Sequence, residues 1–304
     1  MSSSVVKDMP FEDFERVLLR VKEVYGASGK MVIISGGEPL MRPDLEDCVQ
    51  RIHRLGFGCG MVTNGYLLTP ERADRLIRAG LGSATVSIDG IREDHDWMRG
   101  VEGSHEKALN AARILSGSGI AFDVVTCVNR RNIGHLDEIK EELIDNGIKA
   151  WRLFTVFPAG RAASDDQMQL SNDEFRRLME FIASTRKEKR IKANYACEGF
   201  LGEYEGKVRD SIFMCKAGLT VASVLADGSI SACASIRSDY TQGNIYRDDF
   251  VECWENGFKA YRDHSWMKQG ECANCRWFRY CQGNGMHLRD AEGKLLQCNL
   301  KKLQ

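Results

Sequence analysis

The sequence predicts an α/β protein in which a parallel sheet or barrel is followed by a small cysteine-rich region. Short β-branched runs alternate with amphipathic helical stretches through the first 190 residues, and strands joined by crossover helices pair in parallel with right-handed connections. Only three of the eleven cysteines lie in that part, whereas eight lie between Cys197 and Cys298. We therefore expect an α/β domain over residues 1–190 and a ligand-bearing domain over residues 191–304.

Five strands are expected, each brief, apolar and bounded by turn residues. They cover Met31–Ser35, Gly60–Thr63, Ala84–Ile88, Phe122–Val128 and Trp151–Phe157. Helices fall between them. Thr69 with Pro70 starts one helix, and Ser171 with Glu174 forms a capping box that starts another. The series opens with an amphipathic helix over residues 11–24 rather than a strand, so we expect that a leading strand and its loop are missing.

Polar residues follow several of these strands. SGGEP covers residues 35–39, TNG covers 63–65, SIDG covers 87–90 and VNR covers 128–130. Ligands bind at the carboxyl ends of parallel strands, so we expect these segments to face a common site. Two glycines in SGGEP let a ligand approach the backbone, and Glu38 offers a carboxylate to a cationic group.

The cysteines of the second region have the spacing of metal ligands. Cys272, Cys275 and Cys281 are followed by Cys298, and by spacing alone such a set suits zinc or an iron–sulfur cluster equally well. Farther upstream, an Asp227-Gly228 turn predicts a hairpin that brings Cys215 and Cys233 together. Cys197, eighteen residues before Cys215, is a further candidate ligand.

Charge and hydropathy exclude some classes of partner. The 42 Lys and Arg residues nearly balance the 43 Asp and Glu residues, so no global field draws the protein to nucleic acid or to an anionic membrane. No apolar run approaches the ~18 residues of a membrane span. The clustered cysteines indicate a reducing compartment, and we expect a cytoplasmic protein.

Taken together, GGEP and SIDG after strands and the spaced C-terminal cysteines resemble a radical SAM enzyme with a SPASM domain. The resemblance implies a partial (β/α)6 TIM-like barrel, here without its first strand, followed by auxiliary 4Fe-4S clusters in the SPASM domain. It implies that S-adenosylmethionine binds at residues that follow the strands. The expected residues are Gly36, Gly37 and Glu38 at the methionyl amino group, Ser87 and Asp89 near the ribose or carboxylate, and Thr63 and Asn64 lining the same pocket, with Pro39 as a further cofactor-binding residue.

The resemblance also assigns the cysteines. It implies that one auxiliary cluster lies on Cys272, Cys275, Cys281 and Cys298, and that Cys215 and Cys233 belong to a second cluster. The family pattern places another cysteine where this chain has Gly285. The second cluster therefore lacks an expected ligand, which leaves Cys197, His287, substrate or solvent to complete it.

A larger departure is that no CxxxCxxC motif, which holds the radical-generating cluster in the family, occurs in the 304 residues. We expect a truncation at the N-terminus, with loss of the motif in a natural relative as the alternative. As written, the chain is expected to be inactive in radical chemistry, because side chains alone do not supply the cofactor's radical.

The function implied by the resemblance is modification of a peptide or protein substrate, as in maturases of ribosomally synthesised peptides, with electrons from a donor such as a flavodoxin or ferredoxin. Two alternatives stay open. One is a catalytically dead iron–sulfur protein that binds a peptide or transfers electrons. The other is a zinc-stabilised α/β protein.

Overall fold

The computed structural model describes residues 8–236 and 240–304. The chain divides into two compact units. Unit 1 contains the residues up to Val128, Gly134–Leu153 and Glu188–Lys192, and unit 2 contains Asn129–Ile133, Phe154–Lys187 and Ala193–Gln304.

The main sheet has six strands whose spatial order follows the sequence. They are β1 (Met31–Ile34), β2 (Gly58–Thr63), β3 (Leu81–Ser87), β4 (Ala121–Val128), β5 (Ala150–Thr155) and β6 (Lys192–Tyr195). The pairs from β1 to β4 are parallel, which confirms the predicted α/β class. All five predicted strands are present within a few residues of their expected bounds.

The sixth strand, β6, was not predicted from the sequence. It has only four residues, two of them polar, and it follows a basic run at the end of a helix. Its burial alternates between exposed and buried positions, but two periods of alternation are too short to stand out as a strand pattern.

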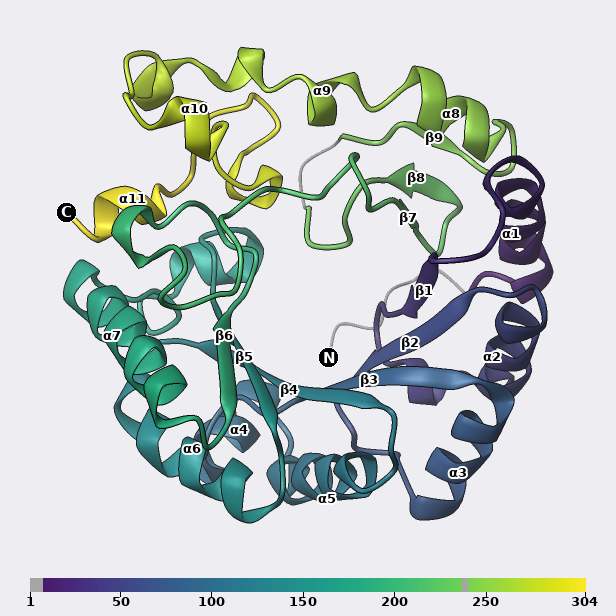
Figure 1. The fold of residues 1–304 in the computed structure, drawn as a ribbon, viewed down its shortest axis with the longest axis horizontal. Helices are drawn as coiled ribbons and strands as arrows, with labels where there is room; N and C mark the ends of the chain where they lie inside the picture. Colours follow the sequence, from purple (N-terminus) through teal and green to yellow (C-terminus); the bar gives the residue numbers. More distant parts are fainter. Residues whose placement is uncertain (1–7, 237–239) are drawn as a thin grey trace. The chain divides into compact units, whose positions relative to one another are not determined.

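Helices cover one face of the sheet in unit 1. These are α1 (Phe11–Tyr25), α2 (Leu45–Arg54), α3 (Pro70–Ala79), α4 (Arg92–Arg99), α5 (Ser104–Ser116) and α6 (Leu136–Asp145), while α7 (Asn172–Glu188) belongs to unit 2. Figure 1 shows α2, α3 and α5 along the outer side of β2 to β4. The capping predictions are confirmed, since the Thr69 side chain accepts from Arg72 N and Ser171 and Glu174 exchange hydrogen bonds at the start of α7.

The two faces of this sheet differ in polarity. Val86 and Val124 are fully buried, on the face that the helices cover. The neighbouring positions Thr85 and Asp123, paired in register between β3 and β4, lie on the opposite face. The sheet therefore has an apolar face against the helices and a partly exposed face that carries polar groups.

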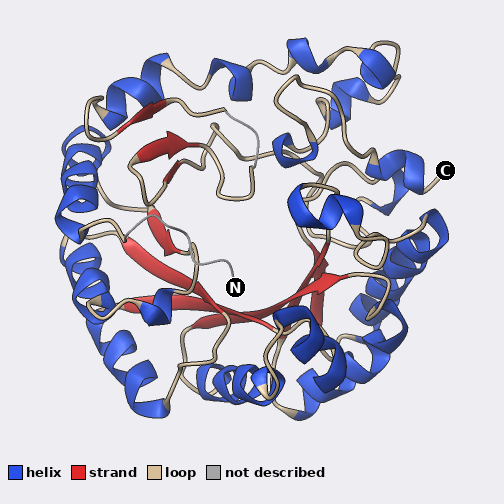
Figure 2. Ribbon diagram, turned by 180° about the vertical axis from the view of Figure 1, so that it is seen from behind, coloured by secondary structure: helices blue, strands red, loops and turns tan. Residues whose placement is uncertain are grey.

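Unit 2 after β6 consists largely of loops and short elements, as Figure 2 shows. The strands are β7 (Ser223–Val224), β8 (Ser229–Ser231) and β9 (Gly243–Asn244), and the helices are α8 (Phe250–Asn256), α9 (Lys259–Arg262), α10 (Phe278–Cys281) and α11 (Asn299–Lys302). The predicted hairpin is confirmed, because β7 and β8 pair antiparallel across a turn that ends at Gly228. Gly228 has φ +83° there, a conformation that favours glycine.

Two hydrophobic clusters hold this cysteine-rich part together. One is built around Ile230, Phe258, Tyr261 and Met267, with Cys215 and Cys233 packed against it. The other is built on Phe200, Phe213 and Leu300, with Cys215, Cys281 and Cys298 at its surface. The apolar core of unit 2 thus packs directly against the candidate ligands. No helix among residues 8–236 and 240–304 is long and apolar enough to span a membrane.

Candidate functional site

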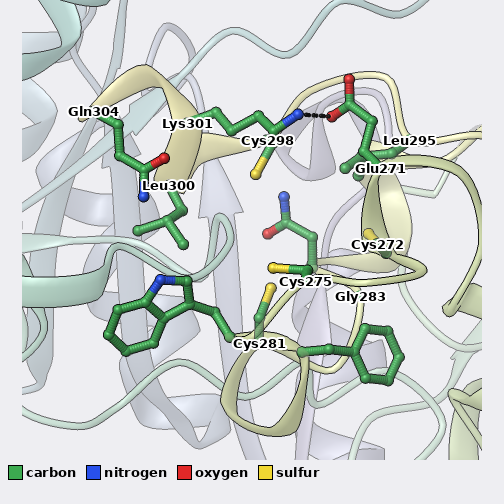
Figure 3. A pocket seen from close by; sticks show the side chains of 13 residues that line it. Glu271, Cys272, Cys275, Cys281, Gly283, Leu295, Cys298, Leu300, Lys301 and Gln304 are labelled. Atoms are coloured by element: carbon green, nitrogen blue, oxygen red, sulfur yellow. Dashed lines mark ion pairs between the residues drawn. The ribbon is translucent and has the colours of Figure 1, made fainter.

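Four cysteines of unit 2 surround one cavity of about 80 Å³. Cys272 ends a short 3-10 helix over Gly270–Cys272, Cys275 lies in the loop before α10, Cys281 ends α10, and Cys298 directly precedes α11. Figure 3 shows the sulfur atoms of Cys275, Cys281 and Cys298 turned into the central space, with Cys272 at its side. A Lys301–Glu271 ion pair of 3.1 Å lies at the edge of the same cavity. The structure therefore brings together the four residues expected to share one auxiliary cluster.

The backbone near two of these thiols donates hydrogen bonds to sulfur. The N–H groups of Asn284 and Gly283 donate to Cys281, and those of Lys301 and Leu300 donate to Cys298. Burial, followed by the charge of Cys298, raises the pKa of the Cys281 thiol to about 12. Burial likewise raises the pKa of Cys298. Without a cation these thiols are protonated, and their backbone donors are oriented to stabilise thiolates.

Two further donors lie at this cavity, and the sequence offered no signal for either. Arg289 is 2% exposed, and its Nη2 donates to Cys272 Sγ at 3.5 Å while its other nitrogens bond to the carbonyls of Gly283 and Gly293. Trp277 lines the cavity, and its buried Nε1 has no hydrogen-bond partner among the described residues. The Arg289 cation thus lies against Cys272, and a free N–H group belongs to a residue that lines the cavity.

A second set of thiols lies elsewhere in unit 2. Cys215 and Cys233 pack against the same hydrophobic cluster, which includes Met286, and the charges of both contribute to raising the pKa of Cys197 after burial, its main cause. Cys215 also accepts hydrogen bonds from the N–H groups of Met286 and Ala217. Burial is the main reason that the pKa of Cys215 is raised. Cys197 is the most exposed of the three.

His287 lies one residue beyond the N–H group that bonds to Cys215. Its ring packs edge-on against Phe157 with the centroids 5.2 Å apart, and burial lowers the pKa of His287 to about 4. Its Nε2 is buried without a hydrogen-bond partner among the described residues. In the part of the chain that the structure describes, no three His, Cys, Asp or Glu side chains meet closely enough to hold a single metal ion.

In unit 1, the Glu38 carboxylate is held at the ends of β1 and β2. Its Oε1 accepts hydrogen bonds from Leu40 N and Thr63 Oγ1, and its Oε2 accepts one from Asn64 N at 2.7 Å. The structure therefore groups Glu38, Thr63 and Asn64 as the sequence predicts. Gly36 and Gly37 precede this carboxylate, and a Cβ added to either would meet nothing within 4 Å. Pro39, which starts a short 3-10 turn over Pro39–Met41, is buried.

Ser87 and Asp89 follow β3 and differ in their surroundings. Ser87 is half-buried at the end of the strand. Asp89 is 1% exposed; its Oδ1 accepts from Cys127 N at 2.9 Å and its Oδ2 pairs with Arg99. The Asp89 N–H donates to His95 Nδ1 at 3.0 Å. Asp89 therefore ties β3, β4 and α4 together in this structure.

Sequence reasoning missed a polar group on the exposed face of the sheet. Arg152 on β5 donates through Nε to Asp123 Oδ2 at 2.9 Å and through Nη2 to Thr85 Oγ1 at 3.1 Å. The Arg152 side chain is 40% exposed. Because the three residues come from different strands, only the strand register could have shown that they meet.

The comparisons with known proteins agree with this arrangement. Residues 2–143 match the model of the radical SAM superfamily, and residues 215–276 match the model of SPASM, an iron–sulfur cluster-binding domain. The AdoMet-dependent heme synthase of Methanosarcina barkeri is 29% identical over 299 residues, which cover 91% of this chain and 83% of that protein. The mycofactocin maturase MftC of Mycobacterium tuberculosis is 28% identical over 262 residues, which cover 84% of this chain and 66% of that protein.

The fold has solved counterparts. The structure of anSMEcpe with bound AdoMet and a peptide superposes with a TM-score of 0.72 at 20% identity, covering 97% of this chain and 86% of that one. The six-stranded parallel sheet and the cysteine-lined cavity thus define the class as an α/β protein with an iron–sulfur domain. The chain belongs to the radical SAM superfamily and carries a SPASM domain. Its relatives are enzymes, and the two families bind 4Fe-4S clusters and S-adenosylmethionine.

Proposed function

We propose that this chain is a radical SAM/SPASM enzyme whose unit 2 holds a 4Fe-4S cluster on Cys272, Cys275, Cys281 and Cys298. The observation that carries the proposal is the cavity of about 80 Å³ that all four thiols line. Four thiolates on one zinc ion converge at about 2.3 Å from a common point and leave no such space between them. Cluster ligation suits a cavity, because the sulfur ligands sit on different iron atoms.

The residues around the thiols fit a negatively charged cluster. The backbone N–H groups at Cys281 and Cys298 supply hydrogen bonds to ligand sulfur, Arg289 supplies a positive charge at Cys272, and the Trp277 Nε1 is free to donate to a sulfide. Hydrogen bonds and charges of this kind stabilise a cluster and adjust its potential. The bound cluster would supply one-electron transfer.

S-adenosylmethionine is proposed to bind at the Gly36–Pro39 segment, with its amino group on Glu38. An ionised carboxylate has about four acceptor positions, and three of those on Glu38 are filled by Leu40, Thr63 and Asn64. One position on Oε2 is left for an ammonium group. Thr63 and Asn64 orient the carboxylate, and the open space at Gly36 and Gly37 admits the ligand. Ser87 and Asp89 are retained as candidates near its ribose or carboxylate.

For the substrate we propose a peptide or protein, supported by the similarity to the mycofactocin maturase over 84% of this chain. A tetrapyrrole is the second candidate, because a heme synthase, a second protein named Fe-coproporphyrin III synthase and a pre-heme d1 synthase match over 83% to 91% of this chain. A reducing, cytoplasmic location and an electron donor such as a flavodoxin or ferredoxin complete the proposal, since thiolate ligands must stay reduced.

Anaerobic reconstitution with iron and sulfide tests the cluster assignment. We expect a brown protein, and we expect Cys281→Ser to lose much of its iron. Cys253→Ser is the matched control, because Cys253 is also half-buried but packs against the Ile230 cluster away from the cavity. A colourless, fully folded, zinc-loaded protein would overturn the assignment. Titration with coproporphyrin, read by its Soret band, and with a labelled precursor peptide then separates the two substrate classes.

A further inference from the structure

The second set of thiols forms a ligand group of its own. Cys197 follows β6, Cys215 lies before the β7–β8 hairpin and Cys233 lies after it. Cys215 and Cys233 pack against the same hydrophobic cluster as Met286, and the charges of both act on Cys197, whereas Cys272, Cys275, Cys281 and Cys298 line one cavity. The seven thiols therefore separate into a group of four and a group of three. The inference below rests on the proposed function, in which unit 2 holds iron–sulfur clusters.

Three cysteines leave one iron of a 4Fe-4S cluster without a protein ligand. The residue at which the family pattern supplies a cysteine is Gly285, which has no side chain. The Gly285–His287 segment nevertheless lies at this group, because the N–H of Met286 donates to Cys215 sulfur. A side chain of the Gly285–His287 segment is therefore close enough to Cys215 to ligate the same cluster.

The His287 ring occupies the space that a side chain at position 285 would enter. A Cβ built on Gly285 would lie 2.7 Å from His287 Cε1, 3.0 Å from Nδ1 and 3.6 Å from Nε2. A residue larger than glycine at 285 and the present imidazole are therefore mutually exclusive. The His287 imidazole therefore lies where the side chain of a cysteine at position 285 would lie in the family pattern.

The ring also has an unused ligating atom. The His287 Nε2 is buried and has no hydrogen-bond partner among the described residues, and a buried polar atom without a partner is costly unless something binds it. The T-shaped contact with Phe157 holds the orientation of the His287 ring. Neutral imidazole nitrogen is a good ligand for iron.

We propose that His287 is the fourth protein ligand, through Nε2, of a second 4Fe-4S cluster whose other ligands are Cys197, Cys215 and Cys233. Replacing a thiolate by a neutral imidazole removes one negative charge from the cluster. Its reduction potential is therefore higher than that of an all-cysteine cluster, as in iron–sulfur centres where histidine replaces cysteine. The second cluster would accept electrons more readily than the one on the four thiols.

Electron paramagnetic resonance of the reconstituted, reduced full chain tests this ligand directly. Protein labelled with ¹⁵N-histidine is expected to show a strong histidine nitrogen coupling on one of its two clusters. His287→Ala should lose about half of its iron, which for two 4Fe-4S clusters is about four of eight atoms. His287→Cys should keep the iron, lose the nitrogen coupling and shift the potential of that cluster downward. His53→Ala, which removes an exposed histidine of α2 in unit 1, is the control and should change none of these.

The outcomes separate this inference from the proposed function. If the wild-type chain binds no iron at all, the proposed function fails first. The His287 assignment is wrong if iron and two cluster signals are present but no histidine coupling appears. It is also wrong if His287→Ala keeps all its iron and an unchanged spectrum. In either case solvent or another group completes the cluster. Hydrogen exchange of the β7–β8 hairpin in each variant shows whether loss of iron comes from unfolding.

Discussion

Replacement of His95 should remove a large part of the acid sensitivity of unit 1. The His95 side chain is 1% exposed on α4, and its Nδ1 accepts a hydrogen bond from the Asp89 N–H. Protonation at Nδ1 breaks that bond. Burial, the Arg99 charge and the His105 ring 5.6 Å away all oppose a positive charge, while Asp89 and Asp96 favour it. The balance lowers the pKa of His95 to about 4.

The sign and size of the effect follow from proton linkage. In the unfolded chain a histidine titrates near pH 6.5, so below that pH the unfolded state binds a proton that folded His95 refuses until about pH 4. Stability present above about pH 6.5 is therefore lost as the pH falls toward 4. For this pair of pKa values the loss between pH 7 and pH 5 is about 2 kcal/mol.

The assay is the free energy of unfolding of unit 1 in urea at these two pH values, read by pulsed hydrogen exchange of peptides from β3 and α4. His95→Gln should be less stable than wild type at pH 7, because packing is lost, yet it should lose about 2 kcal/mol less than wild type on acidification. His53→Gln, at an exposed histidine of α2, should behave like wild type. Parallel losses in His95→Gln and wild type would refute the reasoning.

Three other substitutions or measurements test separate parts of the structure. Glu38→Gln should weaken S-adenosylmethionine binding roughly ten-fold or more by calorimetry, since a hydrogen bond to a charged group is worth about 1.5–3 kcal/mol. Glu46→Gln on α2 is the control. Equal affinities of wild type and Glu38→Gln would remove Glu38 from the site. Glu198→Ala should destabilise unit 2 by about 2 kcal/mol or more, because it leaves two buried donors without an acceptor. These are the Thr155 N–H and one of the Thr155 and Tyr195 hydroxyls, which otherwise bond to each other. Glu198→Gln keeps an acceptor oxygen and should cost about 1 kcal/mol. Equal unfolding energies in the two variants would contradict this account. The 304-residue chain, reconstituted and reduced, should form no 5′-deoxyadenosine from S-adenosylmethionine, because it contains no CxxxCxxC motif for the radical-generating cluster. Turnover detected by chromatography would show that a cluster on other residues cleaves the cofactor.

Much of the fold could be predicted because its signals are local. Each of the five predicted strands is a short, largely apolar run bounded by turn residues, and the Thr69 and Ser171 caps depend on residues three positions apart. β6 was missed because its four residues carry too little periodicity. Its place in the sheet depends on neighbours in space rather than on its own sequence.

The same distinction between local and long-range signals applies to the candidate sites. The Cys272, Cys275 and Cys281 spacing and the Asp227-Gly228 turn are local, so they predicted which thiols gather. Arg289 at Cys272, Glu198 at Thr155 and Arg152 at Asp123 join residues that are 17 to 43 positions apart. Nothing near each residue in the chain marks its partner, and only tertiary packing brings them together.

Packing also links the two thiol groups of unit 2. Cys215 packs against both hydrophobic clusters, and the one built on Phe200, Phe213 and Leu300 also contacts Cys281 and Cys298. Since buried apolar groups transmit strain rather than absorb it, the geometry at one group constrains the other through these side chains. We therefore expect that filling one proposed site orders part of the second, and that metal binding at either contributes to folding of the same unit. We expect a region with so little regular secondary structure to depend on its cluster ligands for stability, as small metal-held domains do.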